Sequence, residues 1–159
     1  MILAVVTISD RCSQGLMTDT AGPAVVAALK AGWPQAEIET RLLPDEEEQI
    51  TAALLEFSSN GAELALTVGG TGLGPRDRTP EATRRVIDRE APGLAEAMRA
   101  KSAAKNPYAW LSRGVAGLKG GTLIVNLPGS ERGALECWAA IAPLVRHGLE
   151  VICGGQTHP

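Results

Sequence analysis

The sequence predicts an α/β fold with a doubly wound, mostly parallel sheet, and two observations support this prediction. Short runs rich in isoleucine, valine and leucine alternate along the 159 residues with longer amphipathic stretches. Apolar runs bounded by polar residues are typical of strands that are buried on both faces of a parallel sheet. Strands that alternate with helices indicate a sheet covered by helices. One domain over residues 1–159 is expected, since the chain is long enough for one hydrophobic core and short for two.

The first half of the chain is expected to hold two strands and two helices. In chain order these are a strand at 2–8, a helix at 21–31, a strand at 37–43 and a helix at 45–59. The strand at 2–8 is apolar until Ser9-Asp10-Arg11 ends it. The helix at 45–59 places its apolar side chains at i, i+3, i+4 and i+7, which is the spacing of one helix face that covers a sheet. These side chains are Ile50, Ala53, Leu54 and Phe57.

The second half is expected to hold two strands and three helices. In chain order these are a strand at 63–68, helices at 79–89 and 94–104, a strand at 122–125 and a helix at 130–152. Thr79-Pro80-Glu81 is typical of a helix start, with a threonine cap, proline in the first turn and an acid close behind. Pro143 could kink the last helix.

Composition excludes several classes of function. The formal net charge is −3, and the basic residues are scattered among acids, which disfavours nucleic-acid binding. No apolar run is long enough to cross a membrane, and residues 1–8 lack the basic leader of a signal peptide, so a cytoplasmic location is expected. The three cysteines form no C-x-x-C pair and there are only two histidines, His147 and His158. This disfavours a zinc site, a disulfide framework and a Ser-His-Asp hydrolase.

Three loops are expected to hold a ligand, because ligands of open α/β sheets bind at the carboxyl ends of the strands. They are Ser9-Asp10-Arg11, the glycine-rich loop from Gly69 to Asp77, and Asn126-Leu127-Pro128-Gly129-Ser130. We expect all three to lie at one edge of the sheet.

The glycine-rich loop has glycine at four of six positions, which lets main-chain N–H groups approach a phosphate closely. These positions are Gly69, Gly70, Gly72 and Gly74. The loop is neither a Rossmann fingerprint, because Pro75 stands where the third glycine belongs, nor a Walker A loop, because Pro75-Arg76 follows Gly74. The alternative is a tight connection between strand and helix with no ligand.

Two aspartates are candidates for metal binding. Asp77 lies just before the expected helix start at Thr79, and it is either a solvated loop acid between Arg76 and Arg78 or a metal ligand. Asp45 opens a helix with Glu48 three residues later, so on position alone it is better explained as a helix cap in a capping box.

Other candidates carry weaker signals. Ser130 is a plausible N-cap whose helix start could bind phosphate, and Ser112-Arg113 pairs a hydroxyl with a guanidinium suited to phosphate. The tryptophans are expected in the core or an interface. His147 is expected to be a packing or surface residue.

Taken together, these motifs resemble the molybdopterin adenylyltransferase family, which includes bacterial enzymes and the G domains of eukaryotic molybdenum-cofactor proteins such as gephyrin. The resemblance covers nearly the whole chain, and its most specific part is the long motif from Gly69 to Thr83. The motifs are Ser9-Asp10-Arg11, Pro44-Asp45-Glu46, residues 69–83, Asp88-Arg89-Glu90, Leu111-Ser112-Arg113 and Asn126-Leu127-Pro128-Gly129-Ser130.

The resemblance implies a three-layer α/β/α molybdopterin-binding fold, a homotrimer, and Mg²⁺-dependent transfer of AMP from ATP to the terminal phosphate of molybdopterin with release of pyrophosphate. It makes Asp45 and Asp77 the catalytic and metal-binding residues and places Ser112 on the pterin side. The remaining substrate-binding and nucleotide-binding positions are Ser9, Asp10, Gly69, Gly70, Thr71, Gly72, Arg76, Arg113, Asn126, Pro128, Gly129 and Ser130.

Two alternatives stay open beside this interpretation. One sister subgroup has the same fold, an altered acidic motif and weak or no activity, so the chain could be a carrier that binds molybdopterin without chemistry. The presence of both acids, Asp45 and Asp77, favours the active subgroup. A dehydrogenase is disfavoured by the broken glycine pattern. The chain has no fused molybdenum-insertion domain, so hand-over of the product to a separate insertion protein is expected.

Overall fold

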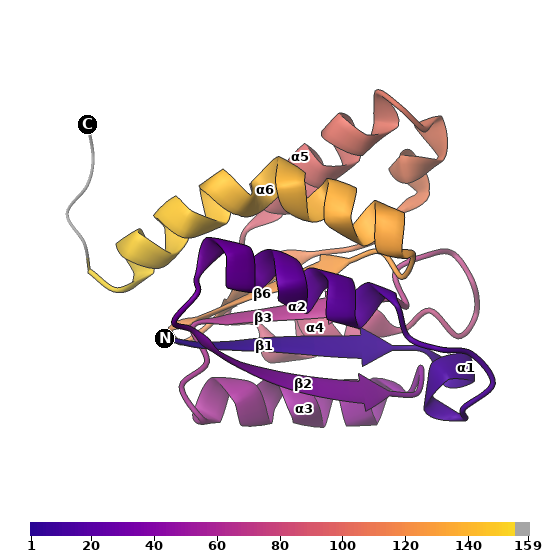
Figure 1. Cartoon of the computed structure of the whole chain (residues 1–159), viewed down its shortest axis with the longest axis horizontal. Helices are drawn as coiled ribbons and strands as arrows, with labels where there is room; N and C mark the ends of the chain where they lie inside the picture. Colours follow the sequence, from indigo (N-terminus) through magenta and orange to yellow (C-terminus); the bar gives the residue numbers. More distant parts are fainter. Residues whose placement is uncertain (155–159) are drawn as a thin grey trace.

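The computed structural model describes residues 1–154, in which one six-stranded sheet lies between two layers of helices (Figure 1). The strands are β1 Ile2–Ile8, β2 Glu37–Leu43, β3 Leu64–Val68, β4 Arg89–Glu90, β5 Ala116–Lys119 and β6 Thr122–Leu127. Their spatial order is β2-β1-β3-β6-β5-β4. The first four of these are parallel, and β5 and β4 run antiparallel to their neighbours. The predicted α/β fold with a mostly parallel sheet is confirmed.

The helices divide between the two faces of the sheet. They are α1 Asp10–Ser13, α2 Ala21–Gly32, α3 Glu47–Ser59, α4 Thr79–Val86, α5 Pro92–Ala103, the 3-10 helix η1 Pro107–Leu111, and α6 Glu131–Ile152. Helices α2, α5 and α6 cover one face, and α3 and α4 cover the other (Figure 1). The three-layer arrangement implied by the family resemblance is therefore present. α6 continues past Pro143 to Ile152.

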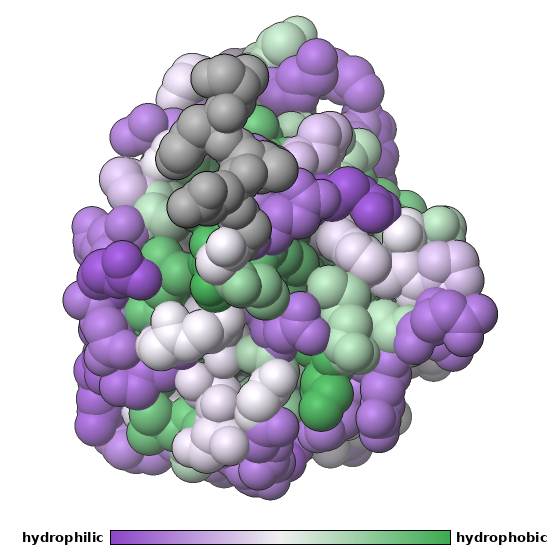
Figure 2. All heavy atoms as spheres, turned by 90° about the vertical axis from the view of Figure 1, so that its left-hand side faces the viewer, coloured by the Kyte–Doolittle hydropathy of each residue, from purple (hydrophilic) through white to green (hydrophobic). Residues whose placement is uncertain are grey.

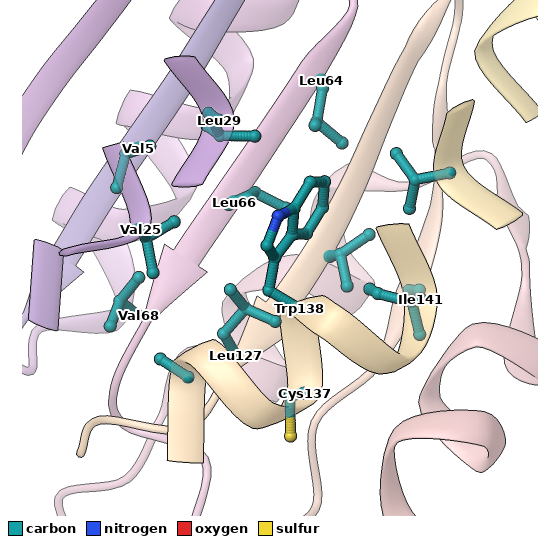
Figure 3. Close-up of a cluster of buried hydrophobic side chains, with 14 of the residues drawn as sticks. Val5, Val25, Leu29, Leu64, Leu66, Val68, Leu127, Cys137, Trp138 and Ile141 are labelled. Carbon is teal, nitrogen blue, oxygen red and sulfur yellow. The ribbon is translucent and has the colours of Figure 1, made fainter. Parts of the chain in front are cut away.

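The two faces of the sheet bury separate hydrophobic clusters. On the side of α2, α5 and α6, Trp138 projects from α6 toward the strands and lies among Leu64, Leu66 and Leu127 (Figure 3). Trp33 packs against the same cluster, with its ring centroid 6.0 Å from that of Trp138. Each fully buried aliphatic side chain contributes about 1.5–3 kcal/mol. This core holds the strands rigidly and so fixes the loops at their carboxyl ends.

Two expectations about the second half of the chain were wrong. The helix expected to reach residue 89 ends at Val86, because Ile87 adopts an extended conformation and the N–H of Asp88 donates to the Leu118 carbonyl at 2.7 Å. This contact begins the pairing of β4 with β5, two strands that the apolar-run analysis did not predict. The Gly120-Gly121 pair between β5 and β6, with Gly120 at a φ of 54°, is the hairpin signal that could have revealed them.

The opposite end of the molecule, where the parallel strands begin, shows hydrophilic and hydrophobic residues interspersed on its surface (Figure 2). Within residues 1–154, no helix has the length and apolar character needed to cross a membrane. His147 lies on the exposed side of α6, 3.7 Å from Glu150, as expected for a surface residue. His158 lies outside the described residues.

Candidate active site

The three predicted ligand loops meet at the carboxyl edge of the parallel strands. Gly69 N–H donates to the Leu127 carbonyl at 3.0 Å, which ties the glycine-rich loop to the end of β6. Ser9 N–H donates to the Leu43 carbonyl at 2.9 Å and ties the first loop to the end of β2. The prediction that these loops gather at one edge is confirmed.

The glycine-rich loop needs glycine for close packing as well as for conformation. Gly69 and Gly70 have φ values of 114° and 63°, which favour glycine. A Cβ on Gly69 would lie 2.2 Å from the Ile8 carbonyl oxygen, and one on Gly129 would lie 3.1 Å from Gly69 Cα. The absence of side chains therefore lets the three loops touch, which buries Gly69 and leaves Gly70 partly exposed.

Thr79 fixes the end of this loop in a way that differs from the prediction. It is the first residue of α4 rather than its cap, and Arg78 occupies the cap position without a side-chain hydrogen bond. The Thr79 hydroxyl instead donates to the Gly69 carbonyl at 2.9 Å, and its N–H donates to the Gly70 carbonyl at 3.1 Å. Asp77 does lie just before this helix, as predicted.

The capping interpretation of Asp45 was wrong. Helix α3 begins at Glu47 with Glu46 at the cap position, and no side chain caps it. The Asp45 carboxylate accepts a hydrogen bond from the N–H of Asp10 at 2.8 Å, and the Asp10 carboxylate accepts one from the N–H of Asp45 at 2.9 Å. This reciprocal pair joins the loops after β1 and β2 and directs the Asp45 carboxylate away from its own helix.

Arg76 completes the network around Asp10. Its guanidinium donates to both carboxylate oxygens of Asp10 at 3.0 Å and to Glu46 at 2.7 Å. The hydrogen bonds that Arg76 donates to Asp10, together with that from Asp45 N–H, lower the pKa of Asp10. Arg76 was expected to contact a phosphate, but the structure engages its guanidinium with acids.

Asp45 has the opposite electrostatic environment from Asp10. Burial raises the pKa of Asp45, and the negative charges of Asp10 and Asp77 raise it further. A half-buried carboxylate among other carboxylates is stabilised in its charged form by a cation. The geometry thus favours a positive charge near Asp45.

Arg113 supports the glycine-rich loop through hydrogen bonds to its main chain. Its Nε donates to the Gly72 carbonyl at 2.7 Å, its Nη2 donates to the Asp77 carbonyl, and Nη1 forms an ion pair with Glu81 of α4. Burial raises the pKa of Glu81, but the hydrogen bond and charge of Arg113, the main-chain N–H of Glu81 itself and the charge of Arg78 together lower it overall. Arg113 was predicted to bind a ligand. In the structure its guanidinium contacts the main chain of the glycine-rich loop and so helps to hold Asp77 in place.

Two pockets open at this edge of the sheet. The Asp45 pocket has a volume of about 640 Å³, and the Ser112 pocket has a volume of about 450 Å³. The Asp45 pocket is lined by Ile8, Ser9, Asp10, Arg11, Cys12, Met17, Thr18, Asp19, Thr20, Ala21, Asp45, Gly69, Gly70, Asp77, Gly129, Ser130 and Glu131. The Ser112 pocket is lined by Gly70, Thr71, Gly72, Asp77, Ala95, Met98, Arg99, Asn106, Tyr108, Ala109, Leu111, Ser112, Gly114, Asn126, Pro128, Gly129, Ser130, Gly133 and Cys137.

The two pockets share a wall. The shared lining residues are Gly70, Asp77, Gly129 and Ser130. Ser130 caps α6 by accepting the Gly133 N–H at 3.2 Å, so the N-terminus of a long helix faces this wall. A group bound in one pocket can therefore meet a group bound in the other beside Asp77.

The structure places the predicted site residues in three groups. The glycine and proline positions, the two aspartates predicted to be catalytic (Asp45 and Asp77), Asp10, Ser9, Thr71, Ser112 and Ser130 line one or both pockets. Asn126 also lines the Ser112 pocket, but its amide donates to Thr67 and Thr83 and its oxygen accepts from Val115 N–H. Arg76 and Arg113 line neither of the two pockets.

Sequence reasoning missed several lining residues, among them Asp19, Arg99 and Tyr108. None of them directly follows a predicted strand, so the position of the strand ends in the sequence gives no signal for them. Arg99 comes from the middle of α5, and Tyr108 comes from η1.

The fold and site together define the class: a doubly wound α/β protein with a two-pocket ligand site at the carboxyl edge of its sheet. Residues 4–147 match the family described as "Probable molybdopterin binding domain", and the chain belongs to this family.

Named relatives agree with this assignment. The chain is 43% identical over 153 residues to the molybdopterin adenylyltransferase of Escherichia coli (strain K12), covering 92% of this chain and 78% of that protein. The crystal structure of the molybdopterin biosynthesis enzyme MoaB from Thermus thermophilus matches with a TM-score of 0.89 and 47% identity, covering 96% of each chain.

A longer relative contains this unit as one part. The chain is 39% identical over 149 residues to the molybdenum cofactor synthesis protein cinnamon of Drosophila melanogaster, and the match covers 93% of this chain. It spans only 25% of the length of that protein.

Proposed function

We propose that this protein acts in molybdenum cofactor biosynthesis as a molybdopterin adenylyltransferase, which transfers AMP from ATP to the terminal phosphate of molybdopterin and releases pyrophosphate. The observation that carries the proposal is the pair of pockets that share a wall containing Asp77, with Asp45 in one and Ser112 in the other. Relatives named for this activity support it over most of the chain. Two pockets with a common wall suit a reaction that joins two substrates.

The main obstacle to this reaction is repulsion between two phosphorylated substrates, so positioning and charge neutralisation dominate catalysis. The Asp45 pocket is lined by five acids and by a single basic residue, Arg11, among residues 1–154. The acids are Asp10, Asp19, Asp45, Asp77 and Glu131. Such a pocket repels a bare triphosphate and suits one that carries a divalent cation.

Mg²⁺ fits this set of residues. It prefers carboxylate, water and phosphate oxygens and needs only one or two protein carboxylates when a phosphorylated substrate supplies the rest. In the part of the chain that the structure describes, no group of three or more histidine, cysteine or acidic side chains could hold a metal alone. Asp45 and Asp77 would hold the ion, which when bound neutralises phosphate charge and orients the phosphates.

The residues of the chain then position the reacting groups. The main chain at Gly70 and the helix start at Ser130 would hold phosphate oxygens beside the shared wall. A phosphate oxygen of molybdopterin forms a bond to the α-phosphorus of ATP as the bond to the bridging oxygen breaks and pyrophosphate leaves. No general base is required, since the attacking phosphate is already ionised near neutral pH.

The test is an anaerobic incubation of the purified protein with molybdopterin and Mg·ATP, followed by measurement of pyrophosphate and of adenylylated molybdopterin by mass spectrometry. We expect equal amounts of both products, and neither when molybdopterin, ATP or Mg²⁺ is left out. Tight binding of molybdopterin without either product would contradict the proposal and support a carrier of the weakly active sister subgroup.

A homotrimer, a cytoplasmic location and hand-over of the product to a separate molybdenum-insertion protein belong to the same proposal. They rest on the family resemblance. Of the tryptophans, Trp33 and Trp138 lie in or against the core, so Trp110, which is 60% exposed, is the tryptophan available to an interface. Light scattering at micromolar concentration should give the trimer mass, and a monomer mass would count against it.

A further inference from the structure

Arg99 is a basic residue in the wall of the Ser112 pocket and is not among the site residues that the sequence motifs predict. It lies in α5, is partly buried, and is the only lysine, arginine or histidine among the described residues that line this pocket. Apolar side chains of the same wall, Ala95 and Met98, come from the same helix. Arg99 also lines a neighbouring hollow together with Arg84, Glu90 and Arg113, so its positive charge lies at the border of a mainly apolar pocket.

The hydrogen bonds of Arg99 leave its charge without a carboxylate partner. Its Nη1 donates to the Gly114 carbonyl at 3.1 Å and makes a long contact of 3.5 Å with the Ser112 carbonyl. Within residues 1–154 its Nε and Nη2 make no hydrogen bond and no acid lies within 4.0 Å, whereas Arg113 and Arg76 are both paired with acids. A partly buried guanidinium that lacks an anion is stabilised when a ligand supplies one.

We propose that Arg99 is a specificity-determining residue that binds an anionic group of molybdopterin, either its phosphate or a thiolate of its dithiolene. This inference rests on the proposed function and assigns each substrate to a pocket. Molybdopterin enters the Ser112 pocket, where one fixed cation meets it. ATP with its metal enters the Asp45 pocket.

The opposite charges of the two pockets support this assignment. The Ser112 pocket has one acid, Asp77, on the shared wall and one base, Arg99, on α5. The Asp45 pocket has five acids and one base. A substrate that brings a divalent cation is favoured in the acidic pocket, and a substrate that brings only negative charge is favoured beside Arg99.

The anchors of Arg99 also explain how it would be aimed. Its Nη1 is held by the Gly114 carbonyl, and the Gly114 N–H donates to the Ser112 hydroxyl, so Arg99 is anchored to the short main-chain segment that carries this hydroxyl. A guanidinium and a hydroxyl that belong to residues of one pocket suit an oxyanion or a thiolate.

The test compares Arg99→Gln with Arg146→Gln as a matched control. Arg146 also donates to a main-chain carbonyl, that of Gly32 at 2.8 Å, but lines neither pocket. By anaerobic titration calorimetry we expect Arg99→Gln to weaken molybdopterin binding about tenfold or more, the effect of losing a charge-assisted hydrogen bond. Mg·ATP binding should not change. In steady-state assays the KM for molybdopterin should rise while the KM for ATP stays constant.

The source of the anion is distinguished with molybdopterin whose phosphate has been removed enzymatically. If Arg99 binds the phosphate, Arg99→Gln and wild type should bind the dephosphorylated pterin equally. If it binds a thiolate, the difference between them should persist. If wild type and Arg99→Gln have the same affinity for intact molybdopterin and also the same affinity for the dephosphorylated form, the inference is overturned.

A second measurement needs no loss-of-function variant. In protein labelled with ¹⁵N-arginine, the Nε resonance that disappears in Arg99→Lys belongs to Arg99. It should shift when molybdopterin is added and stay unchanged with Mg·ATP, and the reverse pattern would overturn the inference. If wild type transfers AMP while Arg99→Gln keeps wild-type affinity for molybdopterin, only the role of Arg99 is refuted. If wild type does not bind molybdopterin at all, the proposed function fails too.

Discussion

The two pockets at the carboxyl edge of the sheet share a wall but are built in different ways. The Asp45 pocket is held by side chains that bind the main chain of other loops, above all the reciprocal hydrogen bonds between Asp10 and Asp45. The Ser112 pocket is held by arginines that bind main-chain carbonyls, with Arg113 on Gly72 and Asp77 and Arg99 on Gly114.

This difference separates two tasks. Carboxylates concentrated in one pocket favour a metal and the phosphates that come with it, while a cation in an apolar wall favours an anionic ligand without a metal. The shared wall, with Asp77 on it, is where the two ligands would meet. Substitutions in each pocket and on the wall should therefore have distinct effects on the two substrates.

The largest effect is expected from the aspartates. Asp45→Asn and Asp77→Asn should each lower AMP transfer about a hundredfold or more, because both retain the side-chain shape and lose the charge that holds Mg²⁺. Asparagine can still accept the hydrogen bonds from Asp10 N–H and Gly74 N–H, so the thermal unfolding midpoint should change little. Pyrophosphate release under saturating substrates is the measurement.

Asp88→Asn is the control for these variants. Asp88 also accepts a main-chain hydrogen bond, from Gly120 N–H at 3.0 Å, but lines neither pocket. It should keep wild-type activity. Wild-type rates in Asp45→Asn and Asp77→Asn as well would show that the two-aspartate mechanism is wrong.

The next effect should come from the shared wall. In Gly70→Ala the new Cβ would lie 2.3 Å from Thr79 Oγ1 and 3.0 Å from Asp45 Oδ1 at a φ of 63°, so the wall must move. We expect both substrates to bind on the order of tenfold more weakly, since small displacements of a catalytic wall have large effects. Calorimetry with each substrate separately is the measurement.

Gly61→Ala is the control for Gly70→Ala. Both glycines have a positive φ, but only Gly70 has close neighbours that an added Cβ would meet. Gly61 has a φ of 82° with no heavy atom within 4 Å of an added Cβ. It should lose about 1–2 kcal/mol of unfolding free energy from backbone strain alone and keep wild-type affinities. If Gly70→Ala weakens the binding of only one substrate, Gly70 does not form part of a wall that both substrates contact.

Ser112→Ala should have a smaller effect, limited to one pocket. The Ser112 hydroxyl accepts the Gly114 N–H at 3.3 Å, so its own proton is available to a ligand. Loss of a hydrogen bond to a charged group costs about 1.5–3 kcal/mol, so molybdopterin should bind at least about tenfold more weakly. Affinity for Mg·ATP should stay constant. An equal loss of affinity for both ligands would show that Ser112 does not contact molybdopterin alone.

Much of this fold could be predicted from the sequence because its central strands are buried on both faces. The fully buried run Leu64–Val68 can be recognised without any knowledge of its neighbours. β5 was not predicted, because half of its four residues are only partly buried and it lies near the edge of the sheet. A strand of this kind depends on its pairing partner rather than on its own composition.

The site was predicted less completely because its geometry depends on contacts between distant residues. The sequence around Asp45 fits a helix cap, yet the N–H of Asp10, 35 positions away, binds that carboxylate instead. In the same way Thr79 has the composition of a cap and binds the Gly69 carbonyl across the loop. Local patterns predicted which loops matter, and the tertiary partners decided what each side chain does.

The smallest effect is expected at Ser130, which both caps α6 and lies on the shared wall. Ser130→Ala should lower the unfolding free energy by about 1 kcal/mol through loss of the cap. Ser130→Asp should keep the cap and interact well with the helix dipole, so its stability should equal that of wild type. The added negative charge of the aspartate should weaken the binding of both phosphorylated ligands more than the alanine substitution does. Thermal unfolding and calorimetry should thus rank the variants differently, with alanine least stable and aspartate the weakest binder. Wild-type affinity in Ser130→Asp would mean that phosphates do not approach this wall.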